Sequence, residues 1–190
     1  WIVNCINTGK LCVFTNTGKM HQIKVLDLPY GKFRDKGIPI DNLSNYNSSE
    51  ENFIYIINLG AIIHSRLLFG TKTAMLKMVD GSEFDVAKRT TASTKLNEDD
   101  ELLIVHAMTG EETVVMQSEK EMFLRIEAST IPEKKKGAVG VRGMKLGAGD
   151  ALAAIYLLNA EDVVNIEVKG KEVALNRLRT AGRDTKGTKR

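Results

Sequence analysis

The stretch that decides the fold runs from Lys10 to Pro29 and reads KLCVFTNTGKMHQIKVLDLP. Its first six residues form an apolar run of the composition that strands favour. Residues 16–19 contain Gly18, which adopts the positive φ of a tight turn at little cost, and residues 20–28 form a second run that ends at Pro29. These features predict an antiparallel β-hairpin.

The hairpin belongs to a unit that repeats along the chain. Four residues of the first unit recur 103 positions later, as Ile23 and Ile126, Pro29 and Pro132, Gly37 and Gly140, Leu43 and Leu146. A more divergent copy lies between them, with Leu96 placed 53 residues after Leu43 and 50 before Leu146. Residues 172–175 echo residues 121–124 at an offset of 51. A period of about 50 residues is typical of propeller-like β arrays.

The later units contain the same elements. Further hairpins are predicted over 67–79 and 113–126, and apolar last strands over 54–57, 102–105 and 152–158. Because one such unit cannot bury its own faces, neighbouring units must stack. The sequence therefore predicts an all-β chain, a propeller-like array of four-stranded antiparallel blades with units at approximately 1–52, 53–106 and 107–158 and a partial unit at 159–190.

Residues 147–151 read GAGDA, a string found in ribokinase-like sugar kinases, where glycine amides hold phosphate and the aspartate deprotonates a hydroxyl. In the repeat, however, Asp150 aligns with Asp100 of the preceding unit, and no βαβ alternation surrounds it. A repeated structural turn is predicted, and no catalytic residue is expected. Residues 151–158 suit a helix by type, but their place in the repeat predicts a strand.

Composition narrows the function further. With 190 residues, 43% of them apolar, the chain can bury a substantial core. No run approaches 18 apolar residues and no signal peptide precedes the first hairpin, so a soluble, cytoplasmic protein is expected. Cys5 and Cys12 fit neither metal nor disulfide spacing and are expected to be small core residues. The three histidines are scattered singly, so neither a metal nor a cofactor is expected. The start at Trp1 rather than Met suggests an excised piece of a longer polypeptide.

Positive charge recurs at one place in every unit, although the net charge is only +3. The connection after each hairpin is basic, and its candidate DNA-binding residues are Lys32, Arg34, Lys36, Lys88, Arg89, Lys95, Lys134, Lys135, Lys136, Arg142, Lys145, Arg183, Lys186, Lys189 and Arg190. In an array around an axis this recurrence would form a belt that binds phosphates. Glycines among these residues would let a polyanion approach the backbone, or they are plain turn glycines. Aromatic residues are scarce, at 6%, so duplex DNA held by its backbone is favoured over single strands.

Three segments together resemble a known family. The run 13–19, the continuation from Ile23 to Pro29 and the run 140–146 look like the C-terminal domain of bacterial type IIA topoisomerase A subunits, which belong to DNA gyrase and topoisomerase IV. The resemblance covers essentially the whole chain, including its end at 182–190.

This resemblance implies a β-pinwheel, a disc of blades whose basic rim bends and wraps duplex DNA. With five or six blades in complete domains, this chain would be one such domain or its C-terminal portion. Cleavage of DNA would belong to the remainder of the A subunit, ATP hydrolysis would belong to the ATPase B subunit of a heterotetramer, and none of the four tyrosines here would be catalytic. The QRRGGKG box of the gyrase protein is absent, so gyrase and topoisomerase IV both remain open.

A second function class is a protein-interaction platform. Residues 97–121 hold eight acidic residues against one lysine and could dock a basic partner.

Overall fold

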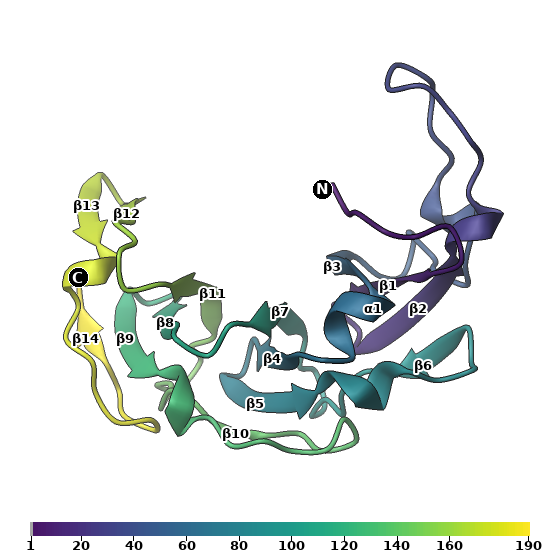
Figure 1. Ribbon diagram of the computed structural model, residues 1–190. Coiled ribbons are helices and arrows are strands. Elements are labelled where there is room, and N and C mark those ends of the chain that lie inside the picture. The colour runs from purple at the N-terminus through teal and green to yellow at the C-terminus, as the bar shows by residue number, and fades with distance from the viewer. Residues whose placement is uncertain (1) are drawn as a thin grey trace.

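The computed structural model describes residues 2–190 as a curved row of β-sheets, seen along its length in Figure 1. Trp1, from which a longer polypeptide was inferred, lies outside the described residues. Three four-stranded antiparallel sheets succeed one another along the chain, and a two-stranded sheet follows them. The predicted all-β architecture of four-stranded blades is confirmed.

Each sheet is built around one predicted hairpin, with the apolar last strand on its inner side. The first contains, in spatial order, β3 (Phe53–Asn58), β1 (Lys10–Thr15), β2 (Lys19–Lys24) and β6 (Thr90–Ala92). The second contains β7 (Leu102–Met108), β4 (Arg66–Thr71), β5 (Met75–Asp80) and β10 (Val141–Arg142). The third contains β11 (Leu152–Leu158), β8 (Thr113–Ser118), β9 (Met122–Glu127) and β14 (Thr188–Lys189), and the last contains β12 (Asn165–Val168) and β13 (Lys171–Ala174).

Helices are short, and most of them directly follow a strand. One α-helical turn, α1 (Leu59–Ile62), begins at Asn58, whose side chain accepts a hydrogen bond from the Ala61 amide. The 3-10 turns are Val25–Asp27, Ile40–Asn42, Gly81–Phe84, Ala128–Thr130 and Leu175–Arg177. Within residues 2–190, no helix has the length and apolar character needed to cross a membrane.

The outermost strand of each four-stranded sheet comes from the following unit. β6 pairs with β2, β10 with β5 and β14 with β9, and each lies within the connection that follows the next hairpin along the chain. The amide of a residue in the incoming connection also bonds a hairpin-turn carbonyl, as Ser93 does to Gly18 and Gly143 to Ala74. The sequence predicted only that these connections are basic. They contain strands of two or three residues, too short to leave a periodic signal in the sequence.

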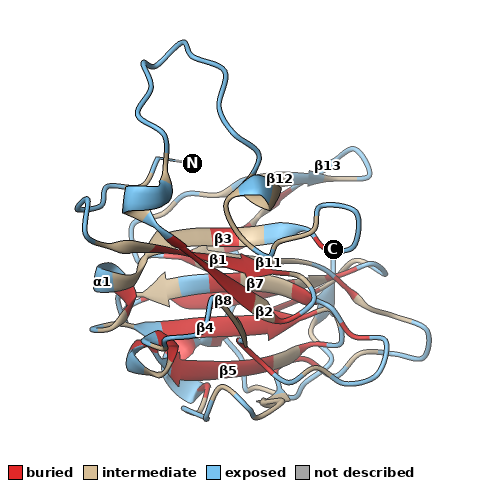
Figure 2. Cartoon of the chain, turned by 90° about the vertical axis from the view of Figure 1, so that its right-hand side faces the viewer, coloured by how far each residue is buried: buried red, intermediate tan, exposed pale blue. Residues whose placement is uncertain are grey.

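The strand predicted over residues 151–158 is confirmed as β11, which pairs with β8 although its alanines and leucines favour helix. Its neighbours override that preference, because β8 offers a full row of main-chain partners. The inner strands are less buried than expected of a strand packed on both faces. β3, β7 and β11 are mostly half-buried, whereas the hairpin strands β1, β4 and β8 are almost entirely buried, as Figure 2 shows by colour.

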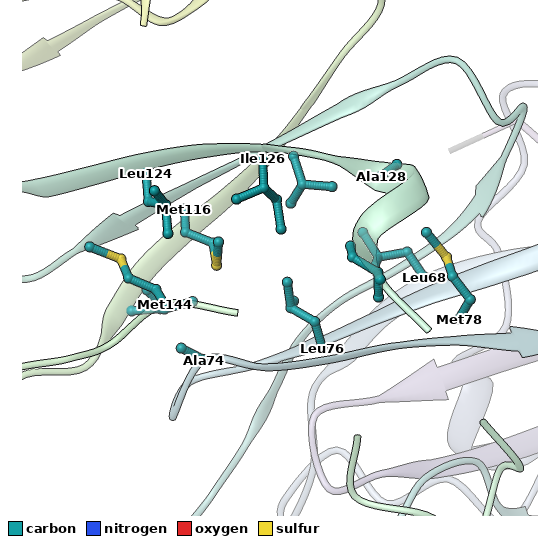
Figure 3. Packing of buried hydrophobic residues seen from close by; sticks show 12 residues of the cluster. Leu68, Ala74, Leu76, Met78, Met116, Leu124, Ile126, Ala128 and Met144 are labelled. Carbon is teal, nitrogen blue, oxygen red and sulfur yellow. The ribbon is translucent and has the colours of Figure 1, made fainter. Parts of the chain in front are cut away.

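The core lies between successive sheets. One cluster joins the first two sheets and contains Phe14 of β1 and Phe69 of β4. Another joins the second and third sheets, where Leu76 of β5 faces Met116 of β8 and Ile126 of β9 in Figure 3. Each large apolar side chain buried this way stabilises the fold by about 1.5–3 kcal/mol. The stacking of units therefore provides the core, as the repeat predicted.

The prediction for the two cysteines is correct for one of them. Cys12 is fully buried in β1, and burial raises the pKa of its thiol to about 12. Cys5 is exposed in the segment that precedes the first strand, and the prediction that it is a core residue is wrong.

Candidate nucleic-acid interface

The exchanged strands form the outer edge of the row. We use this name for β6, β10 and β14 together with the connections that carry them, 86–96, 132–146 and 178–190. In Figure 1 these strands lie on the convex side, and β3, β7 and β11 lie on the concave side. Basic residues were predicted on these connections, and the fold places them along one side of the molecule.

The connections 86–96 and 132–146 place lysines at equivalent points. Lys95 follows the last residue of β6 by three positions, and Lys145 follows the last residue of β10 by three. Both are exposed, and neither ammonium has an ion-pair partner within residues 2–190. Lys88 is also exposed, whereas Arg89 pairs with Asp27 at 3.7 Å. Lys95 and Lys145 are thus repeated, uncommitted positive charges.

The lysine cluster of the connection 132–146 contains both exposed side chains and one that is used in local contacts. Lys134 and Lys135 are exposed, and Lys135 makes only a 3.6 Å ion pair with Glu83. Lys136 is half-buried, with its Nζ donating to the main-chain oxygen of Glu83 at 2.8 Å and lying 6.0 Å from the ring centroid of Phe84. Lys136 therefore contributes to local structure, and Lys134 and Lys135 carry the available charge.

Two arginines link the connection 132–146 to the connection 178–190. The Arg142 guanidinium contacts both carboxylate oxygens of Asp184, at 2.5 and 3.2 Å, and Nη1 of Arg183 donates to the Arg142 carbonyl at 2.9 Å. Arg183 is half-buried, while Lys186, Lys189 and Arg190 are exposed. Arg142 and Arg183 shape the edge, and the three terminal residues present charge to solvent.

The connection that follows the first hairpin does not lie on the outer edge. Residues 28–39, which carry Lys32, Arg34 and Lys36, form a loop that projects from one end of the row in Figure 1. Their side chains are exposed, together with the rings of Tyr30 and Phe33. The equivalent residues 131–142 lie along β5, where the Met78 amide donates to the Pro132 carbonyl and the Lys134 amide to the Met78 carbonyl. The basic residues of the first unit therefore recur in the sequence but do not take the position in the fold that their equivalents take in the later units.

Sequence reasoning missed three polar side chains, buried or half-buried, that hold the outer edge in place. Gln22 donates to the carbonyls of Phe84 and Val86, at 3.3 and 3.1 Å. Arg125 donates to those of Asn176 and Leu178, at 2.7 and 3.3 Å. Lys77 donates to the Lys136 carbonyl of the connection 132–146. Each side chain projects from an outer hairpin strand to the main chain of the next unit. A lysine inside the apolar run Met75–Asp80 was the available signal.

The glycines of the connections serve packing more than access. A Cβ on Gly140 would lie 2.6 Å from the Leu76 oxygen, and one on Gly187 would lie 2.5 Å from the Phe123 oxygen. Both have positive φ and directly precede an exchanged strand. They let the incoming strand approach the hairpin, which favours the plain structural interpretation of these two positions.

Asp150 lies in the repeated turn that its alignment predicted. Its carboxylate accepts from the amides of Lys120 and Ala151, and that of Asp100 accepts from the amide and hydroxyl of Thr73. The preceding residues, Gly149 and Asp99, both have left-handed φ, of 62° and 57°. The two acids cap equivalent turns, which accounts for the GAGDA string without a catalytic role.

The acidic stretch is partly used inside the fold. Asp100 and Glu112 are buried, and the Glu112 carboxylate accepts from the amides of Thr109 and Gly110 at 2.7 and 2.8 Å. Glu121 forms an ion pair with Lys169. Three of the eight acids are therefore committed to local structure, which weakens residues 97–121 as a docking surface for a basic partner.

Comparison with known proteins points to one family. The family model for the DNA gyrase C-terminal domain, a β-propeller, matches residues 65–107 and 112–159. The DNA gyrase A subunit of Lawsonia intracellularis is 30% identical over 158 residues, which cover 82% of this chain and 19% of that protein. The equivalent protein of Staphylococcus epidermidis is 28% identical over 184 residues, 93% of this chain and 20% of that protein. The chain thus spans about a fifth of the length of these relatives.

Solved structures agree in fold. The C-terminal domain of DNA topoisomerase IV superposes with a TM-score of 0.86 at 23% identity, covering 96% of this chain and 58% of that one. The E. coli ParC C-terminal domain gives a TM-score of 0.80 at 15% identity, covering 98% and 78%. Strand-exchanged sheets in a curved row are thus those of a β-pinwheel domain. The chain belongs to the family of the DNA gyrase C-terminal domain, in line with the resemblance.

Proposed function

We propose that the chain is a non-catalytic domain, or the C-terminal portion of one, that binds and wraps duplex DNA for a type II topoisomerase. The observation that carries the proposal is the recurrence of exposed basic residues along the exchanged outer strands, with Lys95 and Lys145 at equivalent places. Family membership supports it. ATP hydrolysis would then fall to the B subunit, whereas DNA cleavage would fall to the rest of the A subunit.

The proposed mechanism is electrostatic. Lysines and arginines on a convex edge neutralise phosphates along a curved path and release the counterions that surround DNA. Bending a duplex of 20–30 base pairs by 40–90° costs about 1–6 kcal/mol, which these contacts would offset. Contacts to phosphates carry no direct sequence information, so binding would be nearly indifferent to sequence.

Salt dependence tests the function itself. If about six phosphates are neutralised, the logarithm of the association constant should fall against the logarithm of salt concentration with a slope of about −5.4. Fluorescence anisotropy with a 40-base-pair duplex across a salt series measures this slope. Salt-independent binding, or no duplex binding at low salt, would contradict the proposal.

A paired charge variant tests the outer edge. Lys95→Ala combined with Lys145→Ala should reduce the slope to about −3.6, since two phosphate contacts are lost, and should weaken binding to unrelated duplexes alike. The matched control is Lys24→Ala combined with Arg66→Ala, which removes the same charge from hairpin strands β2 and β4. Equal effects of the two double variants would show that net charge, not the outer edge, governs binding.

A further inference from the structure

Lys77, the third residue of β5, lies buried beneath the connection 132–146. Its Nζ donates to the main-chain oxygens of Lys135, Lys136 and Ala138, at 3.3, 2.8 and 2.7 Å. The same ammonium lies 5.3 Å from the ring centroid of Phe69. A buried ammonium requires partners for its donors, and here those partners are three carbonyls of one short segment. The segment is thus fixed from inside the fold.

A second group fixes the same segment from its side. The Glu83 carboxylate accepts from the Lys136 amide at 3.0 Å, and the Lys134 amide donates to the Met78 carbonyl at 2.8 Å. With its carbonyls bound to Lys77 and these amides bound elsewhere, the main chain of 134–138 has a defined conformation. The side chains of Lys134 and Lys135 remain exposed upon it.

The position of Lys77 has a counterpart in the first sheet. His21, the third residue of β2, is also buried, and its Nδ1 lies 3.0 Å from Oγ1 of Thr90 in the exchanged strand β6. A buried basic side chain at this point therefore contacts the incoming connection in two successive sheets. In the second sheet, the connection that it holds carries the lysine cluster.

We propose that Lys77 is a positioning residue for DNA binding, which fixes the main chain of 134–138 so that Lys134 and Lys135 face the duplex, without touching DNA itself. The inference rests on the proposed function. It adds a residue that no count of surface charge would include.

Burial lowers the pKa of Lys77 to about 8, against the opposing effect of Glu83. A segment that moved away would expose Lys77 and return its pKa toward 10.5, so a rise in pH from about 8 to 10.5 favours the fixed segment over an open one. The role of Lys77 is therefore tested by substitution at pH 7.

Substitution of Lys77 locates the effect. At pH 7, Lys77→Met should speed hydrogen exchange at the amides of Lys134, Lys136 and Ala138 and weaken duplex binding about tenfold, and Lys77→Arg should restore part of both. Unchanged exchange at these amides, or faster exchange with unchanged DNA affinity, overturns the role of Lys77 alone. Failure of the unaltered chain to bind duplex DNA at low salt overturns the proposed function and takes this inference with it.

Discussion

Replacing Phe14 with alanine is expected to lower the free energy of unfolding by about 3–5 kcal/mol. The Phe14 side chain is fully buried in the interface between the first and second sheets. Its ring centroid lies 6.0 Å from that of Phe69 and 5.3 Å from that of Phe84, both in edge-to-face geometry. Removal leaves a cavity that the paired sheets cannot close, because their main chains are held by hydrogen bonds.

Urea unfolding followed by far-UV circular dichroism measures this loss. Phe33→Ala is the matched control, because that ring is wholly exposed on the projecting loop and its removal should change stability by less than about 0.5 kcal/mol. A loss below about 1 kcal/mol for Phe14→Ala would contradict the view that stacking of neighbouring sheets provides the core.

Replacing Glu51 with alanine is expected to cost about 1–3 kcal/mol, through a polar mechanism. Both side chains of the Glu51–His21 pair are buried, and Oε1 of Glu51 lies 3.0 Å from Nε2 of His21. The carboxylate also accepts from the Thr17 hydroxyl at 3.0 Å and the Asn47 amide at 3.2 Å. Without it, the buried Nε2 of His21 loses this partner.

Acid should destabilise the unaltered chain in two steps. Burial lowers the pKa of His21 despite the nearby carboxylate, so stability falls as the pH drops below about 6.5, where the unfolded chain takes up the proton first. Burial acts to raise the pKa of Glu51, but its hydrogen bonds and His21 outweigh burial and hold that pKa below the ordinary 4.5. Stability is therefore lost further as the pH falls through about 4.5.

Unfolding midpoints measured from pH 7 to pH 3 follow both steps. Glu50→Ala provides the control, because that neighbouring carboxylate is exposed and its loss should leave the profile unchanged. A Glu51→Ala variant as stable as the control at pH 7 would rule out a stabilising role for the buried pair.

The hairpins were predictable because each combines a strong apolar run with a turn that admits positive φ, as in Lys10–Thr15 followed by Gly18. The second and third hairpins place Ala74 and Glu121 at that turn position, with φ of 65°, so their turns were recognisable by repetition and not by glycine. The exchanged strands were not predictable. β10 has two residues, and its stability comes from the hairpin that receives it.

The candidate site was predictable as charge and not as geometry. Lys95 and Lys145 could be placed together because the repeat aligns them. The commitment of Lys136 to the Glu83 carbonyl depends on a contact between residues 53 positions apart, and no local pattern reveals it. The same holds for Lys77, whose three acceptors are carbonyls, which the sequence of side chains does not specify.

Strand exchange also limits how such a chain can be shortened or recombined. In a simple stack of repeats, each unit is self-contained, and one can be deleted or copied with only its two interfaces affected. Here β2 and β5 receive their outer partners from the connections of the next units. Deleting one unit would leave its predecessor with an open sheet edge, which is a template for aggregation. The span from each receiving strand to its donor overlaps the next such span, so any junction between β2 and β14 separates a donor strand from the hairpin strand that receives it.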